Sequence, residues 1–187
     1  MPPKTARFNR AMRLFLKAVQ GGLGFKGVHK ALELLSLMQA CGVAPNIRTY
    51  NTFISICAAS GAQGSTVAID YGVRVVKLMG RMGITPGMKP SLRLLAAVAS
   101  LDSPGKEAPN NVQSGINFLK TMRSAGIELD RRPFDVLVSA CSKHGAADAA
   151  MDSAAKVIAL MQEWGIEVEL NAFTAVIQVR FPLLSMM

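Results

Sequence analysis

Residues 122–127 read Met122-Arg-Ser-Ala-Gly126-Ile127, and the same arrangement of Met, Gly and a β-branched residue occurs four times in the chain. The other copies are Met38-Gln-Ala-Cys-Gly42-Val43, Met79-Gly-Arg-Met-Gly83-Ile84 and Met161-Gln-Glu-Trp-Gly165-Ile166. The four glycines are 41, 43 and 39 residues apart. Because self-similarity at such a period marks stacked structural units, we expect a repeat protein.

The pattern predicts the end of a helix. Glycine adopts the left-handed conformation that closes a helix, and the Val or Ile after it folds back on the last turn, where the Met lies on the buried face. Upstream of the copy at residues 38–43, Val28, Ala31, Leu32 and Leu35 follow a helical spacing. A turn and another helical stretch of similar texture follow Gly42, Gly126 and Gly165, and the stretch after Gly83 is a plainer version. The sequence therefore predicts an all-α protein, an α-solenoid of stacked antiparallel helical hairpins.

The spacing divides the chain into four units and a terminal helix. The predicted units are residues 6–46, 47–87, 88–130 and 131–169, and the terminal helix is residues 170–181. Residues 61–66 and 102–111 are rich in turn-forming residues, so we expect long turns there between the two helices of a unit. Ser65 is a suitable cap for the helix that follows the first of these turns.

Composition excludes several classes of protein. Half of the 187 residues are hydrophobic and 18% are charged, which excludes a disordered or collagen-like chain. The net charge is +9, but it is unevenly distributed: residues 1–100 contain 13 basic and 2 acidic side chains, and residues 101–187 contain 8 and 10. The positive charge therefore belongs to the N-terminal end.

The first thirty residues contain no acid and seven bases, namely Lys4, Arg7, Arg10, Arg13, Lys17, Lys26 and Lys30. Three interpretations are open. These residues, together with Arg48, would neutralise RNA phosphates without selecting a sequence; an acid-free amphipathic start is also typical of a transit peptide; or the bases form the solvated face of a first helix.

The units resemble pentatricopeptide repeats, and the resemblance covers roughly residues 6–177. Thr49-Tyr-Asn-Thr-Phe-Ile-Ser55 matches the aromatic-Asn start of that family's first helix. Met38-Gln-Ala-Cys-Gly-Val-Ala-Pro-Asn46 matches its Met-x-x-x-Gly-Ile-x-Pro-Asp ending, and residues 134–141 give a second good match to the first helix. Phe8-Asn9 can supply the aromatic-Asn pair of a first repeat, which favours a retained helix over a cleaved presequence.

The resemblance implies that single-stranded RNA binds along the concave surface of the first helices, one base per repeat. The base would be chosen by the residue after the aromatic and the last residue of the unit. The corresponding pairs here are Asn9 with Asn46, Asn51 with Gly87, Leu92 with Asp130, and Asp135 with Glu169. Leu92 lacks a hydrogen-bonding group, and the acidic pair would repel phosphate unless Arg131 or Arg132 neutralises it. Asn9, Asn46 and Asn51 are therefore the candidate base readers, with helix or turn capping as the alternative role for Asn46 and Asn51.

No catalytic, metal or cofactor site is expected. Cys41, Cys57 and Cys141 lack the spacing of a zinc site or a disulfide framework. The two histidines, His29 and His144, have no nucleophile or set of metal ligands nearby in the sequence. Cys57 and Cys141 occupy equivalent places in two units, which predicts core packing. The longest charge-free stretch, residues 49–69, is too polar for membrane insertion.

These observations favour a non-catalytic, RNA-associated structural subunit of an organellar ribonucleoprotein, such as a mitochondrial ribosome. RNA would contact the basic N-terminal end, and proteins would contact the later repeats and the apolar residues 181–187. One alternative is a stand-alone single-stranded RNA binder in organellar transcript processing or translation. Another is a protein-only scaffold of an organellar membrane complex. The resemblance implies a mitochondrial location, with the plastid as the alternative.

Overall fold

The computed structural model describes residues 4–100, 109–141 and 147–168, and within these ranges it contains helices and no strand. The first helices of the hairpins are α1 (Lys4–Ala18), α3 (Ile47–Gly61), α5 (Met88–Ala99) and α7 (Arg132–Cys141). The second helices are α2 (Phe25–Ala40), α4 (Thr66–Arg81), α6 (Pro109–Ser124) and α8 (Ala147–Glu163). A π-helical turn, η1 (Val19–Leu23), joins α1 to α2. The described helices thus form four hairpins.

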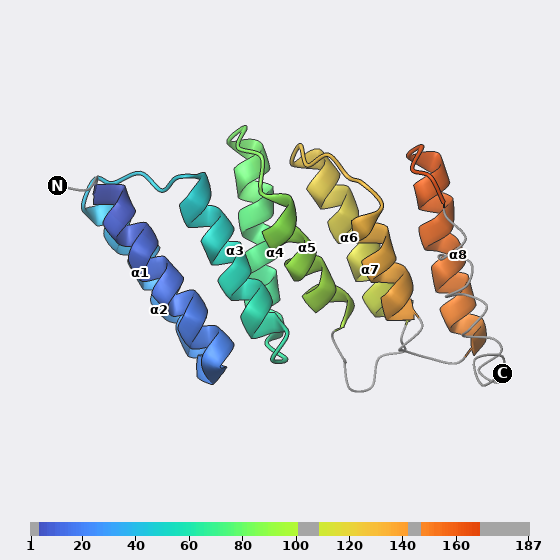
Figure 1. Ribbon diagram of the computed structural model, residues 1–187, viewed down its shortest axis with the longest axis horizontal. Coiled ribbons are helices and arrows are strands. Elements are labelled where there is room, and N and C mark those ends of the chain that lie inside the picture. The colour runs from blue at the N-terminus through green and yellow to red at the C-terminus, as the bar shows by residue number, and fades with distance from the viewer. Residues whose placement is uncertain (1–3, 101–108, 142–146, 169–187) are drawn as a thin grey trace.

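The hairpins stack in chain order and form two layers (Figure 1). Each first helix packs on its own second helix and on the next first helix, so that α1 contacts α3, α3 contacts α5, and α5 contacts α7. In Figure 1 the first helices form the front layer, with α2, α4 and α6 behind them. The predicted all-α solenoid is confirmed. The predicted terminal helix, residues 170–181, lies outside the described residues.

All four second helices end in the same hydrogen-bonded motif. Gly42, Gly83, Gly126 and Gly165 have φ values of +64°, +67°, +79° and +69°. The amide of the next residue donates back to the carbonyl of the Met, as in Val43 to Met38 at 2.8 Å, Ile84 to Met79 at 2.9 Å, Ile127 to Met122 at 3.1 Å and Ile166 to Met161 at 2.9 Å. All four Met side chains are fully buried. Each glycine therefore ends a helix in a Schellman motif and directs the chain into the next unit.

One expected long turn is short. Helix α3 ends at Gly61 and α4 begins at Thr66, so four residues join them. Gly64 has φ +91°, and the amide of Ser65 donates to the carbonyl of Ser60 at 3.2 Å, which closes the turn compactly. Ser65 then caps α4 by accepting a hydrogen bond from the Ala68 amide. The prediction of a long turn is therefore wrong here, and the second such turn lies mostly outside the described residues.

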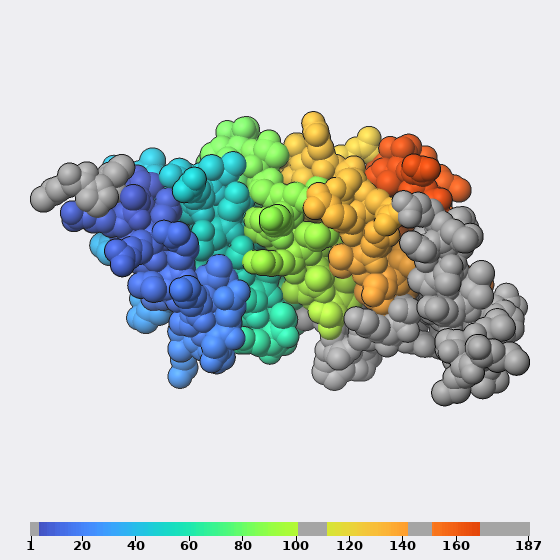
Figure 2. Space-filling view, in the orientation of Figure 1, coloured from blue at the N-terminus to red at the C-terminus, as the bar shows by residue number. Residues whose placement is uncertain are grey.

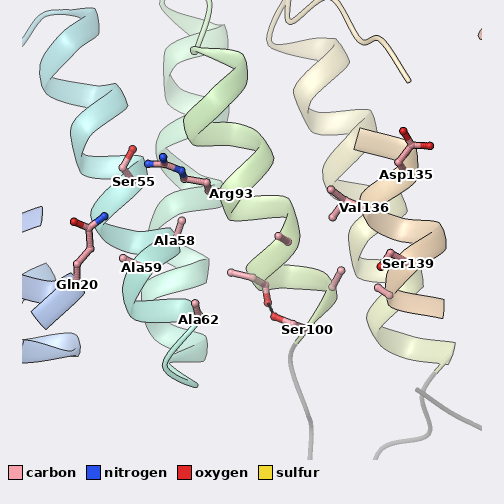
Figure 3. A pocket seen from close by; sticks show the side chains of 14 residues that line it. Gln20, Ser55, Ala58, Ala59, Ala62, Arg93, Ser100, Asp135, Val136 and Ser139 are labelled. Atoms are coloured by element: carbon pink, nitrogen blue, oxygen red, sulfur yellow. Dashed lines mark hydrogen bonds between the residues drawn. The ribbon is translucent and has the colours of Figure 1, made fainter. Parts of the chain in front are cut away.

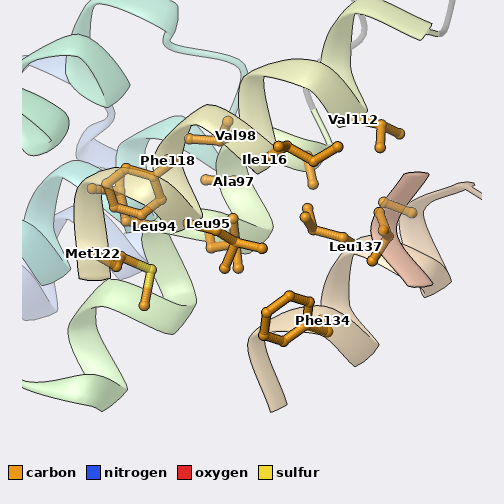
Figure 4. Packing of buried hydrophobic residues seen from close by; sticks show 14 of the residues in the cluster. Leu94, Leu95, Ala97, Val98, Val112, Ile116, Phe118, Met122, Phe134 and Leu137 are labelled. Carbon is orange, nitrogen blue, oxygen red and sulfur yellow. The ribbon is translucent and has the colours of Figure 1, made fainter. Parts of the chain in front are cut away.

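The core consists of two clusters of buried side chains. The N-terminal cluster lies around α1–α3 and includes Met12, Val28 and Phe53. The second cluster extends from α3 to α8, and in Figure 4 side chains such as Leu94 and Phe134 converge between α5, α6 and α7. Cys57 belongs to the first cluster and Cys141 to the second, and both are buried, as their equivalent places in two units predicted. Burial of these faces supplies the main force that holds the hairpins together.

We predict that Gly83→Ala lowers the free energy of unfolding by about 1–2 kcal/mol, because an alanine at φ +67° is strained even where space is open. Equilibrium urea unfolding followed by circular dichroism measures the change. Gly21→Ala is the control: a Cβ there also meets nothing within 4 Å, but its φ is not in the positive region. Equal losses in the two variants would contradict the role of Gly83.

Candidate nucleic-acid interface

A groove crosses the layer of first helices between α1, α3 and α5. It has a volume of about 480 Å³. Its walls are Ala6, Asn9, Arg13 and Leu16 from α1, Arg48, Asn51, Thr52 and Ser55 from α3, and Lys89, Pro90 and Arg93 from α5. Figure 2 shows the face on which these three helices lie side by side. We call this feature the cationic groove.

Four positively charged side chains line the cationic groove. Arg13, Arg48, Lys89 and Arg93 are all exposed, and none of them forms an ion pair with a described residue. Among the described residues, no carboxylate lines the groove. The positive charge is therefore uncompensated by the groove's own walls, which is the arrangement that attracts a polyanion.

The predicted phosphate contacts lie in three places. Arg13 and Arg48 line the groove, while Lys4, Arg7, Arg10 and Lys17 are exposed elsewhere on α1. Lys26 and Lys30 lie on α2, in the second-helix layer, and are not among the residues that line the groove. The Nζ of Lys30 is 2.8 Å from a carboxylate oxygen of Glu33, and this hydrogen bond lowers the pKa of Glu33.

Sequence reasoning missed Lys89 and Arg93. Alignment of the units contains the signal for Lys89, because it lies three residues before Leu92, as Arg48 lies three residues before Asn51. These equivalent positions line the same groove. Arg93 follows four residues after Lys89 and therefore shares its helix face.

Asn9 and Asn46 are joined to each other across the first two units. The Nδ2 of Asn9 donates to Oδ1 of Asn46 at 3.2 Å. The hydroxyl of Thr49, which is fully buried, lies 2.7 Å from Oδ1 of Asn9. Asn46 is also the N-cap of α3. Its Oδ1 accepts a hydrogen bond from the backbone amide of Thr49 at 3.1 Å, and the backbone amide of Asn46 donates to the Thr49 hydroxyl. The capping alternative therefore holds for Asn46, and its carboxamide oxygen is engaged within the protein.

Asn51 is held differently. Its Oδ1 accepts a hydrogen bond from the backbone amide of Gly87 at 2.9 Å. A Cβ at Gly87 would lie 3.0 Å from the Nδ2 of Asn51, so the absence of a side chain there leaves space for the carboxamide. The Nδ2 makes no hydrogen bond to a described residue, and Asn51 lines the groove. Asn51 is therefore a candidate reader that lines the groove and keeps a side-chain donor without a hydrogen bond to a described residue.

Of the other predicted reader pairs, Leu92, Asp130 and Asp135 contact other residues of the protein. Leu92 is half-buried against the core. The Nε of Arg132 donates to Asp130 at 2.7 Å, which lowers the pKa of that carboxyl. Asp135 accepts from the Nε of Arg131 at 3.0 Å, the neutralisation that the sequence required. Glu169 lies outside the described residues.

A second hollow, with a volume of about 690 Å³, adjoins the cationic groove and shares Ser55 and Arg93 with it. It is lined mainly by small side chains from α3, α5, α7 and the residues that follow α3 and α5, namely Ala58, Ala59, Ala62, Ala96, Ala97, Ala99, Ser100, Ser139 and Ala140, together with Val136. In Figure 3 the side chain of Arg93 extends from α5 towards Ser55, and Asp135 lies on α7. The groove surface thus loses its positive charge towards α7.

Two of the three thiols, Cys57 and Cys141, are buried. Burial raises the pKa of Cys57 well above its usual range and that of Cys141 to about 11. Such thiols stay protonated and unreactive at neutral pH. Within the described ranges, His, Cys, Asp and Glu side chains form no group of three that could hold a metal ion. No described helix is long and apolar enough to cross a membrane.

A family model described as the pentacotripeptide-repeat region of PRORP matches residues 15–179. The chain belongs to the pentatricopeptide repeat family. Pentatricopeptide repeats generally bind RNA, and the family is one of RNA-binding helical repeats. Among curated proteins, none matches the chain significantly. The groove on the first helices of this pentatricopeptide repeat chain is therefore the candidate RNA-binding surface.

We predict that Asn46→Ala lowers the free energy of unfolding by about 1 kcal/mol, because the start of α3 loses its cap. Asn46→Asp retains a capping oxygen and should leave the stability nearly unchanged. Urea unfolding of both variants measures the difference. An Asn46→Ala variant as stable as the parent would show that the hydrogen bonds to Thr49 contribute nothing to stability.

We also predict that iodoacetamide at about pH 8 modifies one thiol of the native protein, the exposed Cys41. Cys57 and Cys141 should react only after denaturation, because burial keeps both thiols protonated and out of reach. Peptide mass spectrometry of the alkylated protein identifies the modified sites. Rapid native-state modification of either buried thiol would contradict the packing described for the core.

Proposed function

We propose that this pentatricopeptide repeat protein is a non-catalytic, RNA-associated structural subunit of an organellar ribonucleoprotein, such as the mitochondrial ribosome. The observation that carries the proposal is the cationic groove, which Arg13, Arg48, Lys89 and Arg93 line with no carboxylate from the described residues. Such a surface neutralises phosphates whatever the base sequence. The protein would therefore hold RNA by its backbone.

The state of the candidate base readers supports a structural role over sequence selection. Asn9 and Asn46 hydrogen-bond to each other, and the third and fourth units have Leu92 and an ion-paired Asp135 at the equivalent position. Among the candidate readers that line the groove, Asn51 has a carboxamide nitrogen without a hydrogen bond to a described residue. A single donor specifies too little to select one site among many transcripts.

Residence in an organelle is part of the proposal and follows from family resemblance. In a ribonucleoprotein, the basic N-terminal units would lie against RNA, while the later units, which are slightly acidic, would face proteins.

We predict that the purified chain binds single-stranded and structured RNA with similar affinity, and that binding weakens steeply with salt. Four phosphate contacts give a slope of about −3 in log affinity against log salt for a single strand. Arg48→Glu with Arg93→Glu should lower the affinity by about tenfold or more and reduce the slope by about 1.4. Filter binding across a salt series measures both quantities.

The matched control is Arg74→Glu with Lys77→Glu, which makes the same change in net charge on exposed residues of α4, in the other layer. This control should bind RNA nearly as well as the parent. If both double variants lose the same affinity, net charge rather than the groove holds the RNA. Absent or salt-insensitive binding would remove the RNA role altogether.

Asn51 favours a second candidate function, a stand-alone single-stranded RNA binder with base preference. Asn51 lines the groove, and its Nδ2 has no hydrogen-bond partner among the described residues. Selection from a random RNA pool tests this alternative. An enriched motif that disappears with Asn51→Ala would establish base selection, whereas a pool without enrichment would leave backbone binding as the function.

A further inference from the structure

The second-helix layer is closed at two of its three seams, where a seam is the contact between consecutive second helices. Helix α4 packs on α6, and α6 packs on α8, but α2 makes no comparable contact with α4. The core divides near the same place into its two clusters. The backbones of α2 and α4 therefore do not approach closely, and Leu35 of α2 and Tyr71 and Val75 of α4 are half-buried against the N-terminal cluster.

The repeat register explains why this seam is open. At the α4–α6 seam, the residue after the Met is Gly80, and a Cβ there would lie 2.9 Å from the Cα of Ala125, so glycine permits a close approach. At the α6–α8 seam, the equivalent residues are Arg123 and Trp164, and the guanidinium lies 4.6 Å from the ring centroid. At the α2–α4 seam, these positions hold Gln39 and Met82, and both are exposed.

The open side of α4 carries an apolar stripe. Its members are spaced by three and four residues and so share one helix face: Val67, Tyr71, Val75, Leu78 and Met82. Val67 is 51% exposed, and Leu78 and Met82 are each 43% exposed. At the position of Met82, the next unit has Ala125, which is 6% exposed. Tyr71 and Val75, in the middle of the stripe, are half-buried and pack against the core, so the exposed part is Val67 at the start of α4 and the neighbouring Leu78 and Met82 at its end. Neighbouring exposed apolar side chains such as Leu78 and Met82 mark an interaction surface, whereas single ones do not.

A row of cations borders the stripe. Arg74, Lys77 and Arg81 lie on the outer side of α4, all are exposed, and none forms an ion pair with a described residue. A phosphate backbone would engage this row but leave the apolar stripe in water. A polypeptide helix with leucines on one face and glutamates beside them covers both features at once.

We propose that the open seam between α2 and α4 is a docking site for an amphipathic, acidic helix of a partner protein. The apolar face of that helix packs on the stripe of Val67, Leu78 and Met82, and its carboxylates pair with Arg74, Lys77 and Arg81. The site lies in the second-helix layer, away from the cationic groove, so the inference does not depend on RNA binding.

A synthetic helical peptide tests the proposal against the whole chain. The probe has about 18 residues, or five turns, with Leu at every third or fourth position and Glu beside each Leu. It carries a fluorescent label, and binding is followed by anisotropy. Leu78→Asp should weaken binding by about tenfold or more, because it places a charge in the apolar contact. Leu14→Asp, which alters an exposed leucine of α1, should leave binding unchanged.

A charge swap tests the row of cations separately. Arg74→Glu with Lys77→Glu should weaken binding of the Glu peptide and strengthen binding of a matched Lys peptide, which a misfolded variant would not do. Circular dichroism checks that each variant retains its helices. A scrambled peptide of the same composition that binds equally well would overturn the proposal. Displacement of the Glu peptide by oligouridine would also overturn it, because the face would then bind nucleic acid.

Discussion

The structure depends on one backbone constraint, the left-handed glycine that ends each second helix. With φ between +64° and +79°, these four glycines let the following amide return to the carbonyl of a buried Met. The motif ends the helix, fixes the Met on the core side and sets the direction in which the next unit begins. Because all four units end in the same way, the hairpins stack in one register. That register determines which side chains reach the groove and which reach the seams.

The register explains why the groove is positive. Equivalent positions in successive first helices fall on one surface, so Arg48 and Lys89 line the same groove although they lie 41 residues apart in the sequence. The positive charge arises from one or two cations in each of three units. Towards α7 the equivalent surface is lined by small side chains and by Asp135, whose charge Arg131 balances. The groove is thus graded along the solenoid, as the distribution of charge in the sequence indicated.

The fold was predictable because its determinants are local. A Met followed four residues later by Gly is visible in the sequence, and the motif it forms involves only neighbouring residues. The site was predictable in part. Arg13 and Arg48 were identified, but Lys89 and Arg93 were missed because the third unit has Leu92 at the position taken as the reader. Turn length was also misjudged, since composition at residues 61–66 indicates a turn but not how tightly a single glycine, Gly64, closes it.

The fate of the three asparagines could not be read from the sequence, because it depends on contacts between units. Asn9 and Asn46 are 37 residues apart, and their hydrogen bond exists only once α1 packs on α3 and the buried Thr49 hydroxyl holds both carboxamides. Asn51 escapes this arrangement because the residue that closes its unit is Gly87, which offers a backbone amide and no side chain. The two pairs therefore differ in hydrogen bonding for a reason that lies at the end of the unit. A capping side chain engages the first carboxamide, while a glycine engages only the Oδ1 of the second and leaves its Nδ2 without a hydrogen bond to a described residue.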